Sequence, residues 1–184
     1  MFEINNYIYY VQMKMNLKIN KLSKKHSKFL FNLRNESSVR KFSRNKKIIK
    51  YEDHLKWLKK KSKDQSYKVI IFSNYKGHNI GYVRLKIEKL NVYVSIAILK
   101  KYRNKGLSKI LLSLAEKKIK NKNLFAEVNK KNLKSISLFN SLNYYKYKDK
   151  GDFLIMKKKQ NQKYASNYLS IIDKIEKIRK NNNQ

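Results

Sequence analysis

The sequence predicts a mixed α/β fold, with a mostly antiparallel, twisted sheet of about seven strands and helices on both faces. Short runs rich in Val, Ile, Tyr and Phe, typical of strands, alternate with segments whose apolar residues recur at helical spacing. Their order along the chain is β, α, α, β, β, β, α, β, α, β, β. Consecutive hairpins followed by a strand–helix–strand unit indicate a sheet that mixes antiparallel and parallel pairing.

The strand-like segments are short and rich in residues that favour extended backbone. Two connections between them, residues 74–79 and Leu90-Asn91, are typical of hairpin turns. The predicted strands are residues 16–20, 67–73, 80–88, 92–99, 124–129, 144–148 and 153–157.

Helical periodicity appears four times between residues 23 and 142. Ser23 can cap the first helix, the third extends to about residue 119, and Asn143 is placed to end the fourth in a left-handed conformation. The four stripes are His26, Phe29, Leu30 and Leu33; Tyr51, Leu55 and Leu58; Leu107, Ile110, Leu111, Leu114 and Ala115; Ile136, Phe139 and Leu142.

The chain has 184 residues, which suits one domain with a short extension at each end. We expect an N-terminal extension at residues 1–14, the domain at 15–159, and an amphipathic helix with a polar tail at 160–184. The Ile-rich stripe of that last helix could pack on the domain or on a second subunit, so a homodimer stays open.

Composition excludes several classes of protein. The chain has no cysteine, which excludes a disulfide framework and thiolate chemistry, and we predict no metal site. It has no apolar stretch of membrane-spanning length and no secretory signal, which favours a cytoplasmic protein. The net charge of +34 suggests nucleic acid as a partner. We prefer a compositional cause, because the lysines are spread along a chain rich in Asn, Ile and Tyr.

Residues 96–108 predict a strand, a tight basic loop and the start of a helix. Such a turn aims successive backbone N–H groups at one point, where the helix dipole adds positive potential. Gly106 permits close approach of the backbone, Ser108 is small, and Arg103 and Lys105 add charge. The loop by itself indicates an anion site of modest specificity, suited to a pyrophosphate.

Over about residues 15–159 the chain resembles the GNAT superfamily of N-acetyltransferases. The superfamily signature is Arg or Gln, two residues, Gly, one residue, then Gly or Ala, after a Tyr-Arg pair. Tyr102, Arg103 and Gly106 match it, and Ser108 departs from it. A second motif places Asn before a helix ending in Leu-Tyr, three residues, Gly-Phe. Its places are taken by Asn132, Ser135, Leu138, Phe139, Leu142, Asn143 and Tyr144.

The resemblance implies acetyl-CoA as the acetyl donor, lying where the sheet splays between its fourth and fifth strands. Backbone groups on the fourth strand would pair with the pantetheine arm, one N–H would polarise the thioester carbonyl, and the loop amides would hold the pyrophosphate. The implied cofactor-binding residues are Ile96, Ile98, Leu99, Arg103, Asn104, Lys105, Gly106, Leu107, Ser108, Asn132, Ser135 and Phe139.

The implied chemistry is attack of a neutral amine on the thioester, which requires a base. Glu127 occupies the position of the base in some GNAT enzymes; the alternative is an edge carboxylate that balances nearby lysines. The usual acid is the Tyr of the Leu-Tyr pair, and Phe139 stands there. Either Tyr144 or Tyr145 substitutes, or the thiolate leaves with help from water and the local positive potential.

The region between the first two helices resembles acetyltransferases that modify nucleotide-linked amino sugars, including those of pseudaminic-acid and surface-glycan synthesis. The resemblance assigns the acceptor site to Arg34, Asn35, Arg40, His54, Trp57 and Arg84. Arginines suit phosphates and Trp57 suits stacking, although packing is the simpler role for Trp57, capping or packing for His54, and Arg34 could bond its own helix. A protein N-terminus, a ribosomal protein, a small amine and a nucleic-acid-binding module remain as alternatives.

Overall fold

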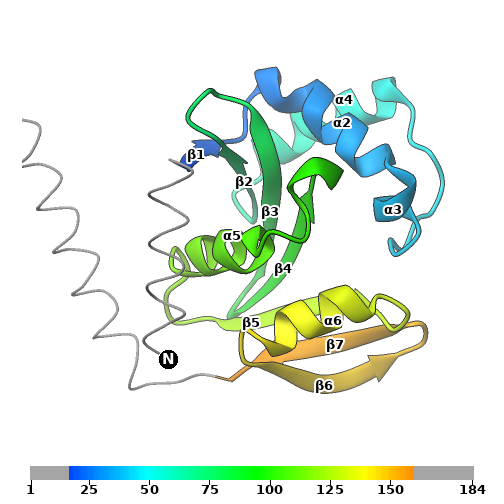
Figure 1. Cartoon of the computed structure of the whole chain (residues 1–184), viewed down its shortest axis with the longest axis vertical. Helices are drawn as coiled ribbons and strands as arrows, with labels where there is room; N and C mark the ends of the chain where they lie inside the picture. The colour runs from blue at the N-terminus through cyan, green and yellow to red at the C-terminus, as the bar shows by residue number, and fades with distance from the viewer. Residues whose placement is uncertain (1–16, 160–184) are drawn as a thin grey trace, which may run out of the picture.

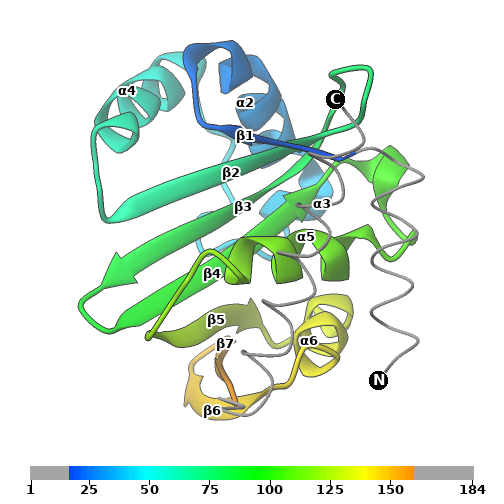
Figure 2. The same cartoon turned by 90° about the vertical axis from the view of Figure 1, so that its left-hand side faces the viewer.

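Residues 17–159, which a computed structural model describes, form a seven-stranded sheet with helices on both faces (Figures 1 and 2). The strand order is β1-β2-β3-β4-β5-β7-β6. The predicted mixed α/β fold is thus confirmed. The predicted N-terminal extension at 1–14 and the C-terminal helix at 160–184 lie outside the described residues.

The predicted strands are all present, with small shifts at their ends. The strands are β1 (Lys18–Lys21), β2 (Tyr67–Ser73), β3 (Asn79–Glu88), β4 (Asn91–Ile98), β5 (Asn123–Asn129), β6 (Tyr144–Lys150) and β7 (Phe153–Lys158). The helices are η1 (Lys24–His26), α2 (Ser27–Asn35), α3 (Ser37–Arg40), α4 (Tyr51–Ser62), η2 (Lys100–Tyr102), α5 (Leu107–Glu116) and α6 (Leu133–Asn140).

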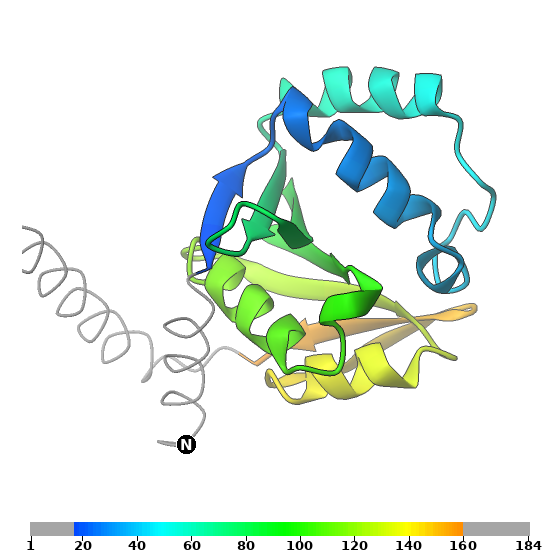
Figure 3. The same cartoon turned by 45° about the horizontal axis from the view of Figure 1, so that its top comes forward.

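Two apolar cores lie on opposite faces of the sheet, under the helices that cover each face in Figure 3. Strand residues two apart share a face, so β2 and β3 contribute buried residues to both cores alternately. On one face, α5 and α6 pack on the larger core, which includes Ile110, Phe139 and Val83. On the other face, α2 and α4 pack on a smaller core that includes Leu33 and Tyr82.

Three helix boundaries differ from the sequence prediction. Ser23 precedes a 3₁₀ turn rather than an α-helix, because the His26 N–H donates to the carbonyl three residues earlier, that of Ser23, at 3.0 Å. The third predicted helix ends at Glu116 rather than near Ile119. The short α3 was not predicted, and it buries no residue. Asn143 does adopt the predicted left-handed conformation, with φ of 65°.

Within the described residues, β4 and β5 form the one parallel pair, and it is short. Asn91, Val92 and Tyr93 pair with residues 123–125. Beyond Tyr93, β4 continues beside β3 as far as Ile98, while β5 continues beside β7. The predicted splay between the fourth and fifth strands is therefore confirmed, and it opens toward the C-terminal ends of both strands.

Candidate functional site

The diverging stretch of β4 exposes backbone groups inside the sheet. In an antiparallel ladder, alternate residues bond the neighbouring strand. The N–H of Leu99 donates to the Ile80 carbonyl at 3.0 Å, which fixes the odd-numbered residues of β4 as the ones bonded to β3. The backbone groups of Ile96 and Ile98 therefore point toward β5. Leu99 is committed to β3, so of the two predicted thioester-polarising amides only that of Ile98 faces the opening.

Gly81 sets how closely β3 approaches this part of β4. A Cβ at Gly81 would lie 2.6 Å from the Ala97 carbonyl oxygen and 2.9 Å from Cγ1 of Ile98. Both distances are far shorter than van der Waals contact, so any side chain at this position would displace the backbone of β4. The absence of a side chain at Gly81 thus helps to fix the strand edge that faces β5.

The loop between β4 and α5 has the backbone shape of an anion site. Asn104 and Gly106 adopt left-handed conformations, with φ of 58° and 70°. Gly106 caps α5 without a side-chain acceptor, and of the first-turn N–H groups that of Lys109 donates to the Gly106 carbonyl at 3.2 Å, which leaves those of Leu107 and Ser108 to a ligand. Asn104, Lys105 and Gly106 are exposed, Ser108 is half-buried, and Leu107 packs in the core. This loop can hold a pyrophosphate through backbone amides and Lys105.

Arg103 is committed to protein partners rather than directed at the loop amides. Its Nε donates to the Ile98 carbonyl at 2.7 Å. Its Nη1 donates to Ser38 Oγ at 2.8 Å, and its Nη2 to Glu36 Oε2 at 2.6 Å. Arg103 therefore fastens the end of β4 to α3. Glu36 and Ser38 lie 67 and 65 residues away in the sequence, so no local pattern indicates this contact.

Asn132 lies at the start of α6, directly after β5. Its Oδ1 accepts the Ser135 backbone N–H at 3.2 Å, which makes it the N-cap of the helix. Phe139, further along α6, is 3% exposed and packs edge to face on Tyr144, with ring centroids 5.0 Å apart. Because α5 and α6 each follow a strand of the parallel pair, both helix N-termini lie at the open end of the splay.

Glu127 lies on β5, on the face that carries Tyr93 and Phe125, whose rings stack at 5.6 Å. Its Oε2 accepts from Nη2 of Arg44 at 2.7 Å, and its Oε1 accepts from Nε of Arg44. The Arg44 guanidinium also lies 4.7 Å from the centroid of the Phe153 ring. The predicted base is thus held in a two-bond ion pair by an arginine from the α3–α4 loop.

The two tyrosines predicted as acids occupy β6, which β7 separates from β5. Tyr144 is 3% exposed, and its hydroxyl donates to Glu116 Oε1 at 2.7 Å. Lys158 donates to the other Glu116 oxygen. Burial, reinforced by the Glu116 carboxylate, raises the pKa of Tyr144 far above its ordinary value. Tyr145 is 38% exposed. The Tyr144 hydroxyl is thus held in the core by Glu116 rather than in the opening between β4 and β5.

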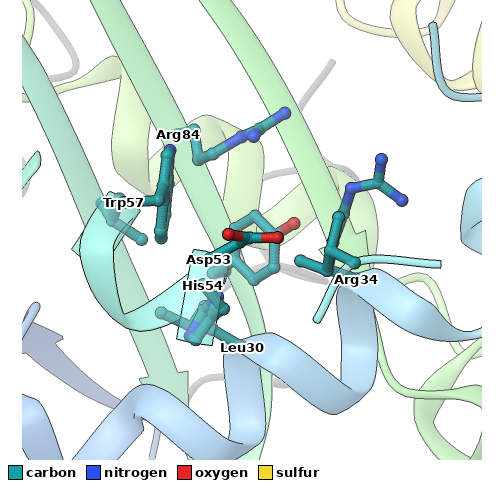
Figure 4. Close-up of a pocket in the computed structure, with 9 residues that line it drawn as sticks. Leu30, Arg34, Asp53, His54, Trp57 and Arg84 are labelled. Carbon is teal, nitrogen blue, oxygen red and sulfur yellow. The ribbon is translucent and has the colours of Figure 1, made fainter. Parts of the chain in front are cut away.

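A cavity of about 200 Å³ lies between α2, α4 and the strands β2 and β3 (Figure 4). Four of the six predicted acceptor-site residues contribute to it, together with Asp53 and Tyr82, which were not predicted. The Asp53 carboxylate lies between Trp57 and Arg34 in Figure 4. The lining residues are Leu30, Arg34, Ile49, Asp53, His54, Trp57, Val69, Tyr82 and Arg84.

Two polar atoms of the lining are buried without a hydrogen-bond partner in the described part of the chain: Arg34 Nη1 and His54 Nε2. Burial lowers the pKa of both side chains, and for His54 a backbone hydrogen bond with Ser27 offsets part of the effect. His54, which stacks between Tyr51 and Trp57, is therefore neutral at pH 7. Unpartnered buried polar groups are costly, so water or a polar ligand in the cavity would satisfy both atoms.

The other two predicted acceptor-site residues hold the loop beside the cavity. The Asn35 side chain donates to the Ile49 carbonyl and accepts the Ile49 N–H, both at 3.0 Å. Arg40 donates to the carbonyls of Asn35 and Lys46, at 3.0 and 2.8 Å. Arg34 both lines the cavity and holds this loop, because its Nη2 donates to the Asn45 carbonyl at 2.6 Å.

A sheet splayed between two parallel strands, with an amide-lined loop after the first of them, defines an acetyl-CoA-dependent acyltransferase fold. The family model of the acetyltransferase (GNAT) family matches residues 29–144, and the chain belongs to this family. It is accordingly an acyltransferase that uses acetyl-CoA. No curated protein sequence matches the chain.

Solved structures with the same fold share little sequence with the chain. Spermidine N-acetyltransferase of Vibrio cholerae, with CoA and spermine, has a TM-score of 0.67 at 16% identity, covering 77% of this chain and 92% of that one. A Methanocaldococcus jannaschii domain has 0.67 at 22% identity, covering 77% and 96%. The Salmonella typhimurium protein yncA, with its cofactor acetyl-CoA, has 0.64 at 18% identity, covering 79% and 95%.

Among residues 17–159, no helix has the length and apolarity needed to cross a bilayer. Nor do three or more His, Asp or Glu side chains of that part of the chain gather into a group that could hold a metal ion.

Proposed function

We propose that the chain acetylates the primary amine of a small molecule that also carries an anionic group. A nucleotide-linked amino sugar, the acceptor that the sequence prediction names, belongs to this class. The observation that supports it is the cavity beside α2 and α4, in which the buried, unpartnered Arg34 Nη1 lies with Arg84 and the Asp53 carboxylate. The cavity lies on the same sheet face as Glu127.

The residues around the splay fit acetyl-CoA, which supplies the acetyl group as an activated thioester. The amides from Asn104 to Ser108 would bind its pyrophosphate. The backbone of Ile96 and the N–H of Ile98 would bind the pantetheine arm, which carries amides of its own. Asn132 would contact that arm from α6, because its Nδ2 is not used in the cap.

Glu127 is the carboxylate on the acceptor side of β5, and we assign it the role of base. When the amine nitrogen forms its bond to the acetyl carbon, the carbon–sulfur bond breaks and CoA leaves as a thiolate. Glu127 takes one proton from the ammonium, directly or through one water, so that a neutral amine attacks. The second proton, which the nitrogen loses as it becomes an amide, passes to water or to the departing thiolate. Since Tyr144 is bound to Glu116 in the core, we infer that the thiolate leaves into the positive potential near Lys105 and the α5 N-terminus.

The charge of the cavity favours an anionic group on the acceptor. Arg34 and Arg84 contribute two positive charges against the single carboxylate of Asp53. Guanidinium groups pair well with phosphates and carboxylates. A cavity of about 200 Å³ is smaller than the roughly 300–1,000 Å³ of typical small-molecule sites, so it would take one ring-sized part of a larger acceptor.

A polyamine is the second candidate acceptor. Asp53 provides a carboxylate for an ammonium, and several solved structures with this fold are spermidine N-acetyltransferases. The two arginines of the cavity disfavour it, because a polyamine brings several positive charges to a chain whose net charge is already +34.

The test is release of CoA thiol from acetyl-CoA with glucosamine, glucosamine 6-phosphate, a uridine-diphosphate-linked amino sugar and spermidine. We expect the two anionic acceptors to have the highest kcat/KM. Trp57, the only tryptophan, lines the cavity, so acceptor binding should also change its fluorescence while CoA alone should not. If spermidine is the best acceptor, a polyamine replaces the anionic amine as the proposed acceptor. If CoA does not bind and no thiol is released, the proposed function is wrong.

Arg84→Gln provides the residue-level control. We expect it to raise KM for glucosamine 6-phosphate at least about tenfold, since a charged hydrogen bond is worth roughly 1.5–3 kcal/mol, and to leave KM for glucosamine nearly unchanged. Lys146→Gln removes the same charge from β6, where Lys146 pairs with Asp149, and should change neither value.

A further inference from the structure

The carboxylate of Glu127 is paired with a cation from its own chain. Both Glu127 oxygens accept hydrogen bonds from Arg44. The two side chains are 26% and 52% exposed, so this ion pair lies at the open surface of the acceptor side rather than in the core. The contact joins residues 83 positions apart and connects the α3–α4 loop to β5 across the mouth of the splay.

The backbone that carries Arg44 is fastened on both sides. Ser43 Oγ donates to the Val39 carbonyl at 2.8 Å on one side, and Arg34 binds the Asn45 carbonyl at 2.6 Å on the other. The partner of Glu127 is therefore a long side chain on an anchored backbone. Its guanidinium can change rotamer and leave the carboxylate while the loop backbone stays in place.

An acceptor amine requires the same carboxylate. At neutral pH a primary amine is an ammonium, and a base that accepts its proton directly must meet it at hydrogen-bond distance. The bidentate guanidinium takes one acceptor site on each Glu127 oxygen and offsets the negative charge, so the carboxylate attracts a second cation less strongly. Arg44 consequently competes with the acceptor ammonium for this carboxylate.

We propose that the Glu127 carboxylate binds the ammonium group of the acceptor, and that the Arg44 guanidinium occupies this carboxylate until the acceptor displaces it. This inference rests on the proposed function and adds that acceptor binding is an exchange of one cation for another. Exposed ion pairs are weak, so the competition should raise KM by about fivefold and no more. Arg44 then sets the affinity for amines without taking part in acetyl transfer.

A positioning role for Arg44 makes the opposite prediction. If the guanidinium holds Glu127 in its working orientation, its removal lowers kcat and leaves KM unchanged. If Arg44 competes with the acceptor, its removal lowers KM and leaves kcat unchanged. The split between the two constants therefore decides the role of Arg44.

The experiment measures CoA release by wild type and by Arg44→Gln, Arg44→Lys and Lys146→Gln, with glucosamine and glucosamine 6-phosphate as acceptors. We expect Arg44→Gln to lower KM about fivefold for both, with kcat within twofold of wild type. Arg44→Lys, which keeps the charge with fewer hydrogen-bond donors, should have a KM between those of wild type and Arg44→Gln. Lys146→Gln, which also removes one positive charge from an exposed pair, should match wild type.

A second readout does not depend on turnover. With CoA saturating, glucosamine titrated against the Trp57 fluorescence should bind about fivefold more tightly to Arg44→Gln than to wild type. Unchanged affinity and unchanged KM, or a fall in kcat alone, would overturn the inference while leaving acetyl transfer by the wild type intact. Loss of CoA binding or of all transfer by the wild type would instead remove the proposed function itself.

Discussion

Replacing Tyr144 by Phe separates a structural role of this hydroxyl from a catalytic one. The hydroxyl donates to the buried Glu116 carboxylate at 2.7 Å, and Phe keeps the ring that packs on Phe139. A hydrogen bond to a charged group contributes about 1.5–3 kcal/mol, and we expect a loss of about 2 kcal/mol. This loss of stability is smaller than the cost of leaving a buried charge without any partner, because Lys158 still binds Glu116.

For a chain of this size, about 2 kcal/mol corresponds to a fall in Tm of roughly 4–8 °C. Thermal unfolding followed by circular dichroism measures it, and CoA release assayed well below Tm should stay within about twofold of wild type. Tyr145→Phe, on the adjacent exposed residue, should change neither Tm nor turnover. A Tyr144→Phe variant with normal Tm but turnover reduced tenfold or more would refute this reasoning and make Tyr144 the acid.

Four further outcomes are expected. Gly106→Asp should weaken CoA binding measured by calorimetry at least tenfold, because it places a carboxylate at the pyrophosphate loop and a side chain at a φ of 70°; unchanged affinity would contradict the loop assignment. Glu127→Gln should reduce kcat by roughly 10²–10⁴ with CoA affinity intact, and normal turnover would remove Glu127 from the mechanism. Gly81→Ala should destabilise the fold by about 1–3 kcal/mol in denaturant melts and weaken CoA binding, since its Cβ would collide with Ala97 and Ile98; a silent variant would show that β4 can yield. Stability should fall as pH is lowered from 7.5 to 5.5, because burial lowers the pKa of His54 from 6.5 in the folded state, so the unfolded chain binds the proton first; His54→Asn should reduce that slope of Tm against pH.

The strands could be predicted well because the fold encodes them locally. Tyr67–Ser73 matches its prediction residue for residue, and its apolar run supplies both cores alternately. The helix Ser37–Arg40 could not be predicted, because four residues without a buried side chain leave no periodic signal. The loop shape at Gly106 followed from one glycine before a helix stripe, a purely local pattern.

Contacts between distant residues were beyond the sequence. Arg103 was expected at the pyrophosphate, but its partner Glu36 lies 67 residues earlier and nothing local links them. No local sequence pattern predicts the Arg44–Glu127 pair either. Tyr82 could have been found, because it lies two residues before Arg84 on the same face of one strand. Asp53 directly precedes the predicted His54, and only the fold shows that both line one cavity.

The unpaired stretch of β4 gives the centre of the sheet a property that normally belongs to its rim. An exposed strand edge is a template for another chain and a risk for aggregation. Here the edge is recessed between two strands that still pair at Asn91–Tyr93, so the gap is a closed-ended slot that admits a narrow molecule from one end only. A thin donor carrying amides can pair there with the backbone of Ile96 and the N–H of Ile98. The same divergence of two strands that forms the site thus places its free edge inside the sheet rather than at the rim.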